Sequence, residues 1–202
     1  MKKIILANAL WLLISIVQAD GMQQFKRFIA SSKTMRANFV QTVVKNGKTE
    51  IAQGTLEVSR PGKFRWTYET PYKQIIIGCY KTLWIYDVAL AQVTKKSMSW
   101  VMSPAYEMLL SGSNYLGRGY QLANDAPTNN LEWIRATSKR MNHIFSSVRM
   151  GFRDNTLVEM ELIDRFNQRM VLQFTQVSKN IAMSEERFIP TYPKEVNILP
   201  TP

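Results

Sequence analysis

The segment from Arg60 to Lys95 constrains the fold of this 202-residue chain most strongly, because it places aromatic-rich strands in close succession. In its first strand, rings at Phe64, Trp66 and Tyr68 alternate with polar residues. Successive side chains of a strand point to opposite faces, so this pattern predicts one apolar face and one solvent-exposed face. The segment holds almost no chemically reactive side chains, which favours a structure that binds something apolar.

The strand from Leu83 to Tyr86 is apolar at every position. Such a strand needs cover on both faces, so either a second layer covers its outer side or its inner side lines a cavity. Alternation alone does not decide whether Leu83 and Ile85 or Trp84 and Tyr86 face the interior.

Residues 1–19 have the form of a secretory signal peptide. Two lysines precede an uncharged run from Ile4 to Val17, and a small-residue cleavage site ends at Ala19. The run is shorter than the roughly 20 residues that a membrane-spanning helix needs. Asp20 stands where a lipid-anchored protein would carry a cysteine. We therefore expect export, cleavage before Asp20, and one soluble domain of residues 20–202.

Strands dominate the chain after one short helix, so the expected fold class is mainly β with few helices, or α+β. Apolar residues at helical spacing predict the helix over residues 22–32. The pair Asn46-Gly47 predicts a tight hairpin turn, because such turns need a positive φ at both central positions. The predicted strands span residues 35–44, 49–59, 64–68, 73–78, 83–86, 91–95, 131–136, 144–152, 157–163 and 170–177.

A second helix is predicted among the strands, from Ser103 to Gly112. Pro104 occupies its first helical position, and a glycine follows its last turn. Met102, Met108 and Leu109 make the segment apolar, so it either packs into the core or lies as a lid across the open mouth of a sheet.

The chain is basic, with a net charge of +11 that falls to +9 without the signal peptide, whose only charged residues are Lys2 and Lys3. An exported protein is not expected to bind nucleic acid. A basic surface attracts anionic headgroups, or an acidic patch on a partner, within roughly 8 to 10 Å. The basic residues are dispersed, however, and solubility alone also accounts for such a charge.

Candidates for catalysis and metal binding are few. His143 is the only histidine and Cys79 the only cysteine, which excludes a zinc site of the usual kind. A lone cysteine in a strand is typically a small buried residue. Glu159 and Glu161 could pair for glycoside cleavage, but their alternation with apolar residues predicts a solvated face. We therefore expect no catalytic residue, no metal and no cofactor.

Several motifs in the centre of the chain occur together in a recognisable order and spacing. They are Arg60-Pro61-Gly62-Lys63-Phe64-Arg65-Trp66, Pro71, Gln74, Lys81-Thr82-Leu83-Trp84-Ile85-Tyr86-Asp87 and Gln92-Val93-Thr94. In these motifs the chain resembles LolA, the family of periplasmic outer-membrane lipoprotein carriers, densely over residues 36–96 and thinly over 113–150. It departs from the family at Cys79-Tyr80, where an Asp-Gly turn is common, and this puts the local hairpin geometry in doubt.

The resemblance implies a single strongly curved antiparallel sheet, a half-open barrel closed by helices as a lid. It implies a monomeric periplasmic chaperone without enzymatic activity, which binds the acyl chains of lipoproteins. Its partners would be an inner-membrane ABC release complex and an outer-membrane receptor lipoprotein. Arg60 matches the family arginine that latches the lid through hydrogen bonds to lid carbonyls. From its position before Pro61-Gly62 alone, Arg60 would be a turn residue.

A carrier must also release its cargo, so flexible methionines and broad aromatic walls suit its task better than a close fit. Two other functions stay open: a non-carrier lipid-binding or regulatory module on the same half-barrel, and a secreted hydrolase. The residues that we predict to line the acyl-chain site are Phe64, Trp66, Leu83, Ile85, Met102, Met108 and Leu109.

Overall fold

A computed structural model describes residues 20–45, 47–98, 109–110, 120–139, 145–164 and 166–199. The ten predicted strands are confirmed, with ends that differ by at most two residues, and two further strands, β7 and β12, were not predicted. The strands are β1 Thr34–Lys45, β2 Lys48–Ser59, β3 Lys63–Thr70, β4 Gln74–Cys79, β5 Thr82–Asp87, β6 Gln92–Ser97, β7 Tyr120–Thr128, β8 Leu131–Ser138, β9 Phe145–Arg153, β10 Thr156–Asp164, β11 Arg169–Lys179 and β12 Asn197–Leu199.

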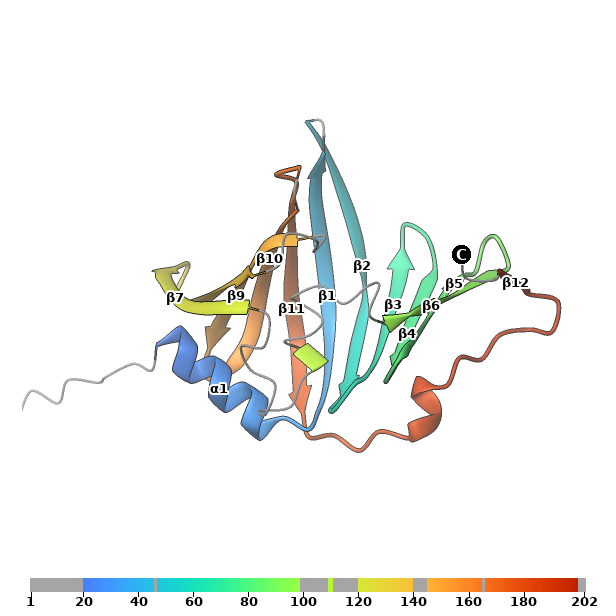
Figure 1. Cartoon of the computed structure of the whole chain (residues 1–202), viewed down its shortest axis with the longest axis horizontal. Helices are drawn as coiled ribbons and strands as arrows, with labels where there is room; N and C mark the ends of the chain where they lie inside the picture. Colours follow the sequence, from blue (N-terminus) through green and yellow to red (C-terminus); the bar gives the residue numbers. More distant parts are fainter. Residues whose placement is uncertain are drawn as a thin grey trace, which may run out of the picture.

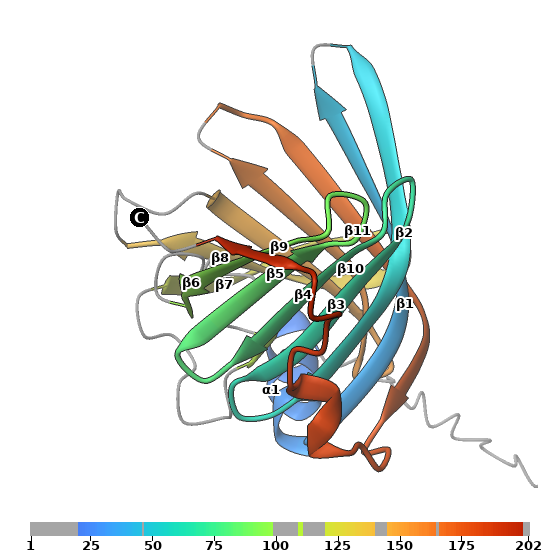
Figure 2. The same cartoon turned by 90° about the vertical axis from the view of Figure 1, so that its right-hand side faces the viewer.

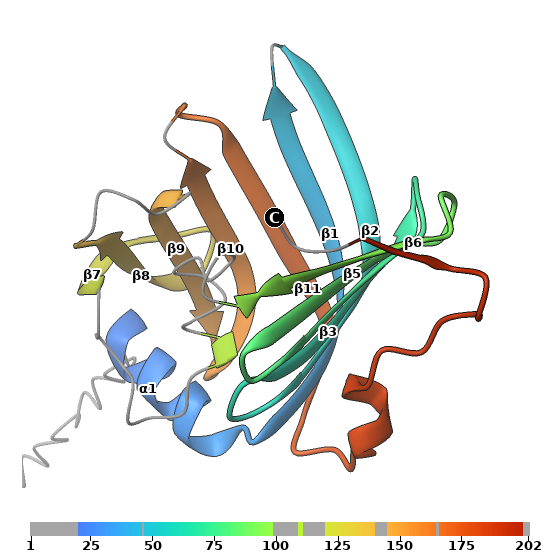
Figure 3. The ribbon, with the colours of Figure 1, turned by 45° about the vertical axis from the view of Figure 1, so that its right-hand side comes forward.

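These strands form one sheet in the order β12-β6-β5-β4-β3-β2-β1-β11-β10-β9-β8-β7. Neighbours are antiparallel throughout, except that β12 runs parallel to β6. The sheet curls into an open trough, whose two arms face each other across the concave side (Figures 1 and 3). This confirms the expected mainly β fold built on a single strongly curved sheet.

Helix α1, Gly21–Ser31, covers one end of the trough and contacts β7 to β10 (Figure 1). The carboxylate of Asp20 caps the helix by accepting a hydrogen bond from a first-turn N–H. Phe25 and Phe28 are buried against the ring of Phe152 on β9, with ring centroids 6.0 and 5.7 Å apart. The predicted first helix is thus confirmed, and its apolar face closes part of the core.

The Cys79-Tyr80 turn keeps a hairpin geometry without the glycine. Tyr80 has a φ of +51°, the left-handed conformation that glycine adopts most cheaply. Its N–H donates a 2.9 Å hydrogen bond to the carbonyl of Gly62, and the Lys63 ammonium lies 5.7 Å from its ring centroid. These contacts hold the turn. β4 and β5 pair in register along their whole length, from Cys79 opposite Thr82 to Gln74 opposite Asp87.

The C-terminal segment is fastened to the convex side of the sheet (Figure 2). Its short 3-10 helix, η2 Glu185–Phe188, contacts β3 and β4. The buried carboxylate of Glu57 accepts hydrogen bonds from Arg187 at 2.7 Å and from Arg36 at 2.8 Å. The buried carboxylate of Glu57 orders this segment, because without either arginine its negative charge would be poorly compensated in the protein interior.

A chain of ion pairs crosses five neighbouring strands of the convex face. Asp125 accepts hydrogen bonds from Arg135 at 2.5 Å and Arg149 at 2.7 Å. Glu161 accepts them from Arg149 at 2.9 Å and Arg169 at 2.5 Å. Each residue comes from a different strand, so the chain ties β7, β8, β9, β10 and β11 together outside the core.

The prediction that Glu159 and Glu161 share a solvated face is wrong for Glu161, which is only 7% exposed. Alternation places it on the outer face, but the long arginine side chains of neighbouring strands cover it. Burial alone would raise the pKa of Glu161, but the hydrogen bonds from Arg169 and Arg149 outweigh burial and lower it. An ionised carboxylate held by two arginines has a structural role here.

Because the folded-state pKa of Glu161 lies below its ordinary value of 4.5, its charge stabilises the fold above that pH. The stabilisation is lost as the pH falls through the folded-state value. We predict that Glu161→Gln lowers the free energy of unfolding at neutral pH by about 1 to 3 kcal/mol and has a smaller effect in acid. Urea denaturation at both pH values measures this. The matched control, Glu159→Gln, should change stability less; equal losses for Glu161→Gln at both pH values would contradict the prediction.

Candidate functional site

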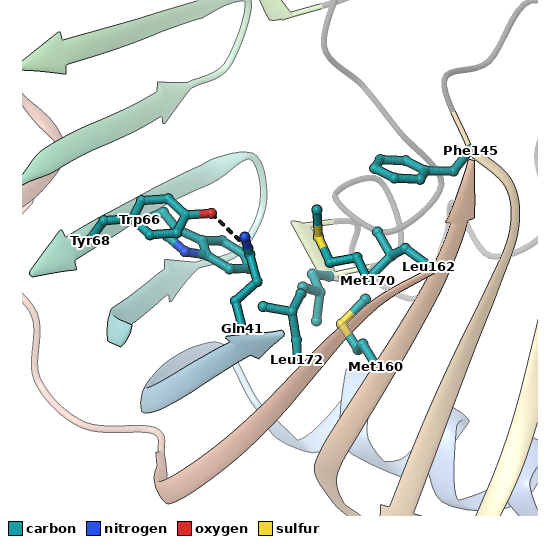
Figure 4. Close-up of a pocket in the computed structure, with 9 residues that line it drawn as sticks. Gln41, Trp66, Tyr68, Phe145, Met160, Leu162, Met170 and Leu172 are labelled. Atoms are coloured by element: carbon teal, nitrogen blue, oxygen red, sulfur yellow. Dashed lines mark hydrogen bonds between the residues drawn. The ribbon is translucent and has the colours of Figure 1, made fainter. Parts of the chain in front are cut away.

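A small apolar cavity of about 80 Å³ lies on the concave side of the trough (Figure 4). Aromatic, leucine and methionine side chains make up almost all of its wall, and one polar residue, Gln41, completes it. The lining residues are Gln41, Trp66, Tyr68, Leu109, Phe145, Met160, Leu162, Met170 and Leu172.

One wall of the cavity, from β1 and β3, is aromatic. Phe39 lies behind the cavity, with ring centroids 5.0 Å from Trp66 and 5.2 Å from Tyr68. The Tyr68 hydroxyl donates a 2.9 Å hydrogen bond to the Gln41 side-chain oxygen, which orients both groups. Interlocked rings have few rotamers, so this wall is stiff.

The opposite wall comes from β9, β10 and β11, and apart from the ring of Phe145 it is aliphatic (Figure 4). Met160 and Met170 face Trp66 and Tyr68 across the cavity. Methionine is unbranched and rotates freely, so this wall can repack around ligands of different shapes. The site therefore combines one rigid side with one adaptable side.

The cavity is too small for an extended ligand as it stands, because ligand pockets typically measure roughly 300 to 1,000 Å³. Leu109, from the inserted segment, occupies part of the space between the arms and is 2% exposed. Of the predicted second helix, only residues 109–110 belong to the described part of the chain, and both are helical there. Binding of a larger apolar group would require Leu109 and its segment to move aside.

The structure brings two of the predicted lining residues, Trp66 and Leu109, to the cavity itself. Phe64 and Leu83 are buried in the same core cluster, and Ile85 packs against that cluster while half-buried. Met102 and Met108 lie outside the described residues. The prediction missed the methionine and leucine wall. The signal for that wall was present in the alternation of apolar and polar residues along β10 and β11.

The structure also shows which face of β5 is internal. Leu83 is fully buried and Ile85 joins the core, whereas Trp84 and Tyr86 point to the other side. The ring of Tyr86 lies 6.2 Å from that of Tyr192, in the C-terminal segment. The first interpretation of this apolar strand therefore applies: the C-terminal segment covers part of its outer face, whereas its inner face belongs to the core and does not line the cavity.

Arg60 lies at the end of β2, against the last turn of α1. Its Nη1 donates a 2.6 Å hydrogen bond to the Ser32 carbonyl, and its guanidinium lies 5.1 Å from the ring centroid of Phe28. Its Nε and Nη2 are buried and meet no hydrogen-bond partner among the described residues. Burial lowers the pKa of Arg60 to about 10, so the side chain stays cationic at neutral pH. Two donor nitrogens of a buried cation are therefore available for pairing.

The turn that follows Arg60 touches the inserted segment. The N–H of Gly62 donates a 3.2 Å hydrogen bond to the carbonyl of Leu110. In the described part of the chain, this backbone contact joins the Arg60–Gly62 turn to the segment that carries Leu109.

The other candidate sites gain no support. Among the described residues, no group of three or more histidine, cysteine or acidic side chains is arranged to hold a metal ion. His143 lies outside them. Cys79 is half-buried rather than fully buried, and burial raises the pKa of its thiol, so it is a poor nucleophile. Within the same residues, no helix is both long and apolar enough to cross a bilayer.

Comparison with known proteins gives a consistent result. The family described as outer membrane lipoprotein carrier protein LolA matches residues 30–191. An outer-membrane lipoprotein carrier protein from Chromobacterium violaceum is 44% identical over 182 residues, covering 90% of this chain and 88% of that protein. One from Neisseria gonorrhoeae is 36% identical over 186 residues, covering 92% and 90%.

Solved structures show the same fold at low identity. A LolA superfamily protein from Nitrosomonas europaea has a TM-score of 0.51 at 10% identity, covering 86% of this chain and 99% of its own. An uncharacterized conserved protein from Thermus thermophilus has a TM-score of 0.55 at 10% identity, covering 88% and 95%. These likenesses support the curved sheet and say nothing further about the site.

The position of Phe64 depends on the absence of a side chain at Gly78. A Cβ at Gly78 would lie 2.0 Å from Cε1 of the Phe64 ring and 2.4 Å from Cε of Met98. We predict that Gly78→Ala lowers the free energy of unfolding by about 1 to 3 kcal/mol, because the ring must move. Phe64→Leu should relieve the clash, so chemical denaturation of the double variant should show less than the summed loss. Additive losses would contradict this account.

Proposed function

The chain belongs to the family of outer-membrane lipoprotein carriers, LolA, and from this membership and its cavity we propose that it shelters lipoprotein acyl chains during transit through the periplasm. The observation that carries the proposal is an apolar cavity between the arms of the trough, closed in part by Leu109 of the inserted segment. This role requires binding and release and no catalysis. A non-carrier lipid-binding module would bind without moving its ligand out of a membrane.

The physical need for such a carrier follows from the cost of exposing hydrocarbon to water. Each methylene hidden from water is worth about 0.8 kcal/mol, so an acylated protein does not cross an aqueous gap unaided. The cavity must therefore grow when cargo enters. In the proposal, Leu109 and its segment move out, while Met160 and Met170 repack against the acyl chains.

The lining then consists of the aromatic wall, the methionine wall and the displaced segment. Trp66 and Leu109 would contact the acyl chains directly. Phe64, Leu83 and Ile85 lie in the same apolar core and would form the floor of an enlarged site. Met102 and Met108 complete the proposed lining as parts of the inserted segment.

The proposed route places the protein between two membranes as a monomer. The signal peptide of residues 1–19 would direct it to the periplasm and be removed there, leaving a single domain without a cofactor. It would accept lipoproteins from an inner-membrane ABC release complex and pass them to a receptor lipoprotein on the outer membrane.

Arg60 is the proposed latch of the closed state. A buried cation with unpaired N–H donors is costly, so carbonyls of the inserted segment are favourable partners for Arg60. The Gly62-to-Leu110 hydrogen bond already holds that segment beside the Arg60 turn. Latching would favour the closed, empty state and so help to expel cargo.

A release assay tests the carrier role. We predict that residues 20–202, added to spheroplasts that contain the release complex, bring a lipoprotein into the soluble fraction. Met170→Gln places an amide in the cavity wall and should reduce the soluble yield by about tenfold, because an unpaired amide beside hydrocarbon is costly. Val171→Gln, the next residue and equally half-buried on the opposite face, should not. Absence of soluble lipoprotein with the unaltered protein would refute the proposal.

A two-step transfer assay tests the latch. We predict that Arg60→Leu loads lipoprotein normally but delivers it to the receptor at least about tenfold more slowly, because the closed state loses its stabilisation. Arg60→Lys should deliver at an intermediate rate. Arg65→Leu, which removes an arginine from the convex face, should behave as the unaltered protein does. Normal delivery by Arg60→Leu would show that Arg60 is not a latch.

A further inference from the structure

Five large apolar side chains are exposed at one end of the sheet, and each is between 51% and 85% exposed. They belong to four hairpins: β1–β2, β3–β4, β5–β6 and β10–β11. We call these five side chains the apolar rim. They are Val44, Ile51, Tyr72, Leu90 and Phe166.

The topology explains why these side chains share one end. In an antiparallel sheet successive turns alternate between the two ends, and the β1–β2, β3–β4 and β5–β6 turns are every second connection. The β10–β11 turn joins them, because Val44 pairs with Arg169 at the start of β11. Figures 1 and 2 show the four turns at the same end, with the β1–β2 hairpin reaching farthest.

Of the remaining exposed apolar side chains, two are located elsewhere, whereas Ile198 of β12 pairs with Val93 near the start of β6, beside the β5–β6 hairpin. Among the described residues, three others are comparably exposed: Tyr80, Ile189 and Ile198. Tyr80 lies in the β4–β5 turn at the opposite end, and Ile189 follows η2 on the convex side. The rim is therefore a concentration of apolar surface, since isolated exposed side chains would be scattered over both ends.

Part of the cavity wall lies at the rim end of the sheet. Phe145 is the first residue of β9 and Met170 the second of β11, and both line the cavity near the rim end of the sheet. A groove of about 440 Å³ runs between Ile51 and Tyr72 of the rim, and Gln41 lines both this groove and the cavity. The groove has both polar and apolar lining residues, and it adjoins the cavity at Gln41.

The shape of the rim indicates the kind of surface that it meets. Tyr72, Leu90 and Phe166 stand on three separate turns, and Val44 and Ile51 lie on the two strands of a fourth hairpin, β1–β2. A rigid protein partner would need a complementary pit for each turn, whereas the headgroup region of a bilayer deforms around them. Two of the five are Tyr72 and Phe166, and exposed aromatic rings partition well at the boundary of headgroups and hydrocarbon.

Charge selects the kind of membrane. Lys45 and Lys48 flank the β1–β2 turn and Lys73 follows Tyr72, while Glu50 and Glu69 lie nearby. The rim is therefore close to neutral by itself. The net charge of +9 on residues 20–202 nevertheless draws the whole molecule to an anionic surface.

We propose that the apolar rim inserts into the headgroup region of an anionic phospholipid bilayer, with the cavity mouth facing the membrane. This contact rests on the proposed carrier function for its purpose, because acyl chains could then enter or leave with little exposure to water. The insertion is shallow and reversible, since four hairpin turns bury far less apolar area than a spanning helix.

Vesicle co-sedimentation of residues 20–202 tests the proposal. We expect binding to vesicles that contain phosphatidylglycerol, weakening with added salt, and at least about fivefold less binding to pure phosphatidylcholine. The triple variant Ile51→Ser, Tyr72→Ser, Phe166→Ser should bind phosphatidylglycerol vesicles at least about tenfold more weakly. The matched control, Tyr80→Ser with Ile189→Ser, removes equally exposed apolar groups away from the rim and should bind within about twofold of the unaltered protein.

Three outcomes would overturn the inference: no binding to either vesicle, an equal loss in the control, or a rim-dependent dimer in sedimentation velocity without vesicles. Circular dichroism checks that both variants are folded. Binding of a fluorescent fatty acid without vesicles reports on the cavity separately. If the unaltered protein does not bind the fatty acid, the result counts against the carrier function. If it binds the fatty acid but not vesicles, only the proposed membrane insertion of the rim is refuted.

Discussion

Burial of one face of a single sheet is the constraint on which the rest of this structure depends. No second sheet covers the concave face within the described residues, so the sheet must curl until its two arms cover each other. Helix α1 and Leu109 cover the part of the concave side that the two arms of the sheet do not cover. A core closed in this way has a removable part, because Leu109 sits between the arms without belonging to either. The same packing that stabilises the empty protein therefore defines where an apolar ligand would go.

Rigidity and adaptability are divided between the two faces of the sheet. On the convex side, Glu57 fastens the C-terminal segment through Arg187 and also binds Arg36 of β1, and the chain of ion pairs around Glu161 spans five strands. On the concave side, the rings around Trp66 are stiff, whereas Met160 and Met170 are free to repack. A ligand can thus be accommodated by side-chain movement inside while the curvature of the sheet is held from outside.

Much of the fold could be predicted, because its strongest signals are local. The alternation at Phe64, Trp66 and Tyr68 gave both the strand and its inner face, and the turn at Gly47 gave the first hairpin. Strand β7 was missed because Asn124, Asp125 and Pro127 favour turns. Asn124 and Asp125 are extended because they pair with β8, and the pairing is interrupted between Asp125 and Thr128. The burial of Glu161 was missed because it depends on arginines from two other strands.

Local sequence patterns were enough to predict the period-two strands, the turns and the apolar character of the interior, because these depend on neighbours a few residues apart. The sequence also carried the family motifs. The folded sheet was needed to show that Leu83 and Ile85 face inward, that the cavity lies between β3 and β10, and that four separate turns meet at one end. These features depend on which distant strands become neighbours when the sheet curls, and alternation along one strand holds no information about its partners across the trough.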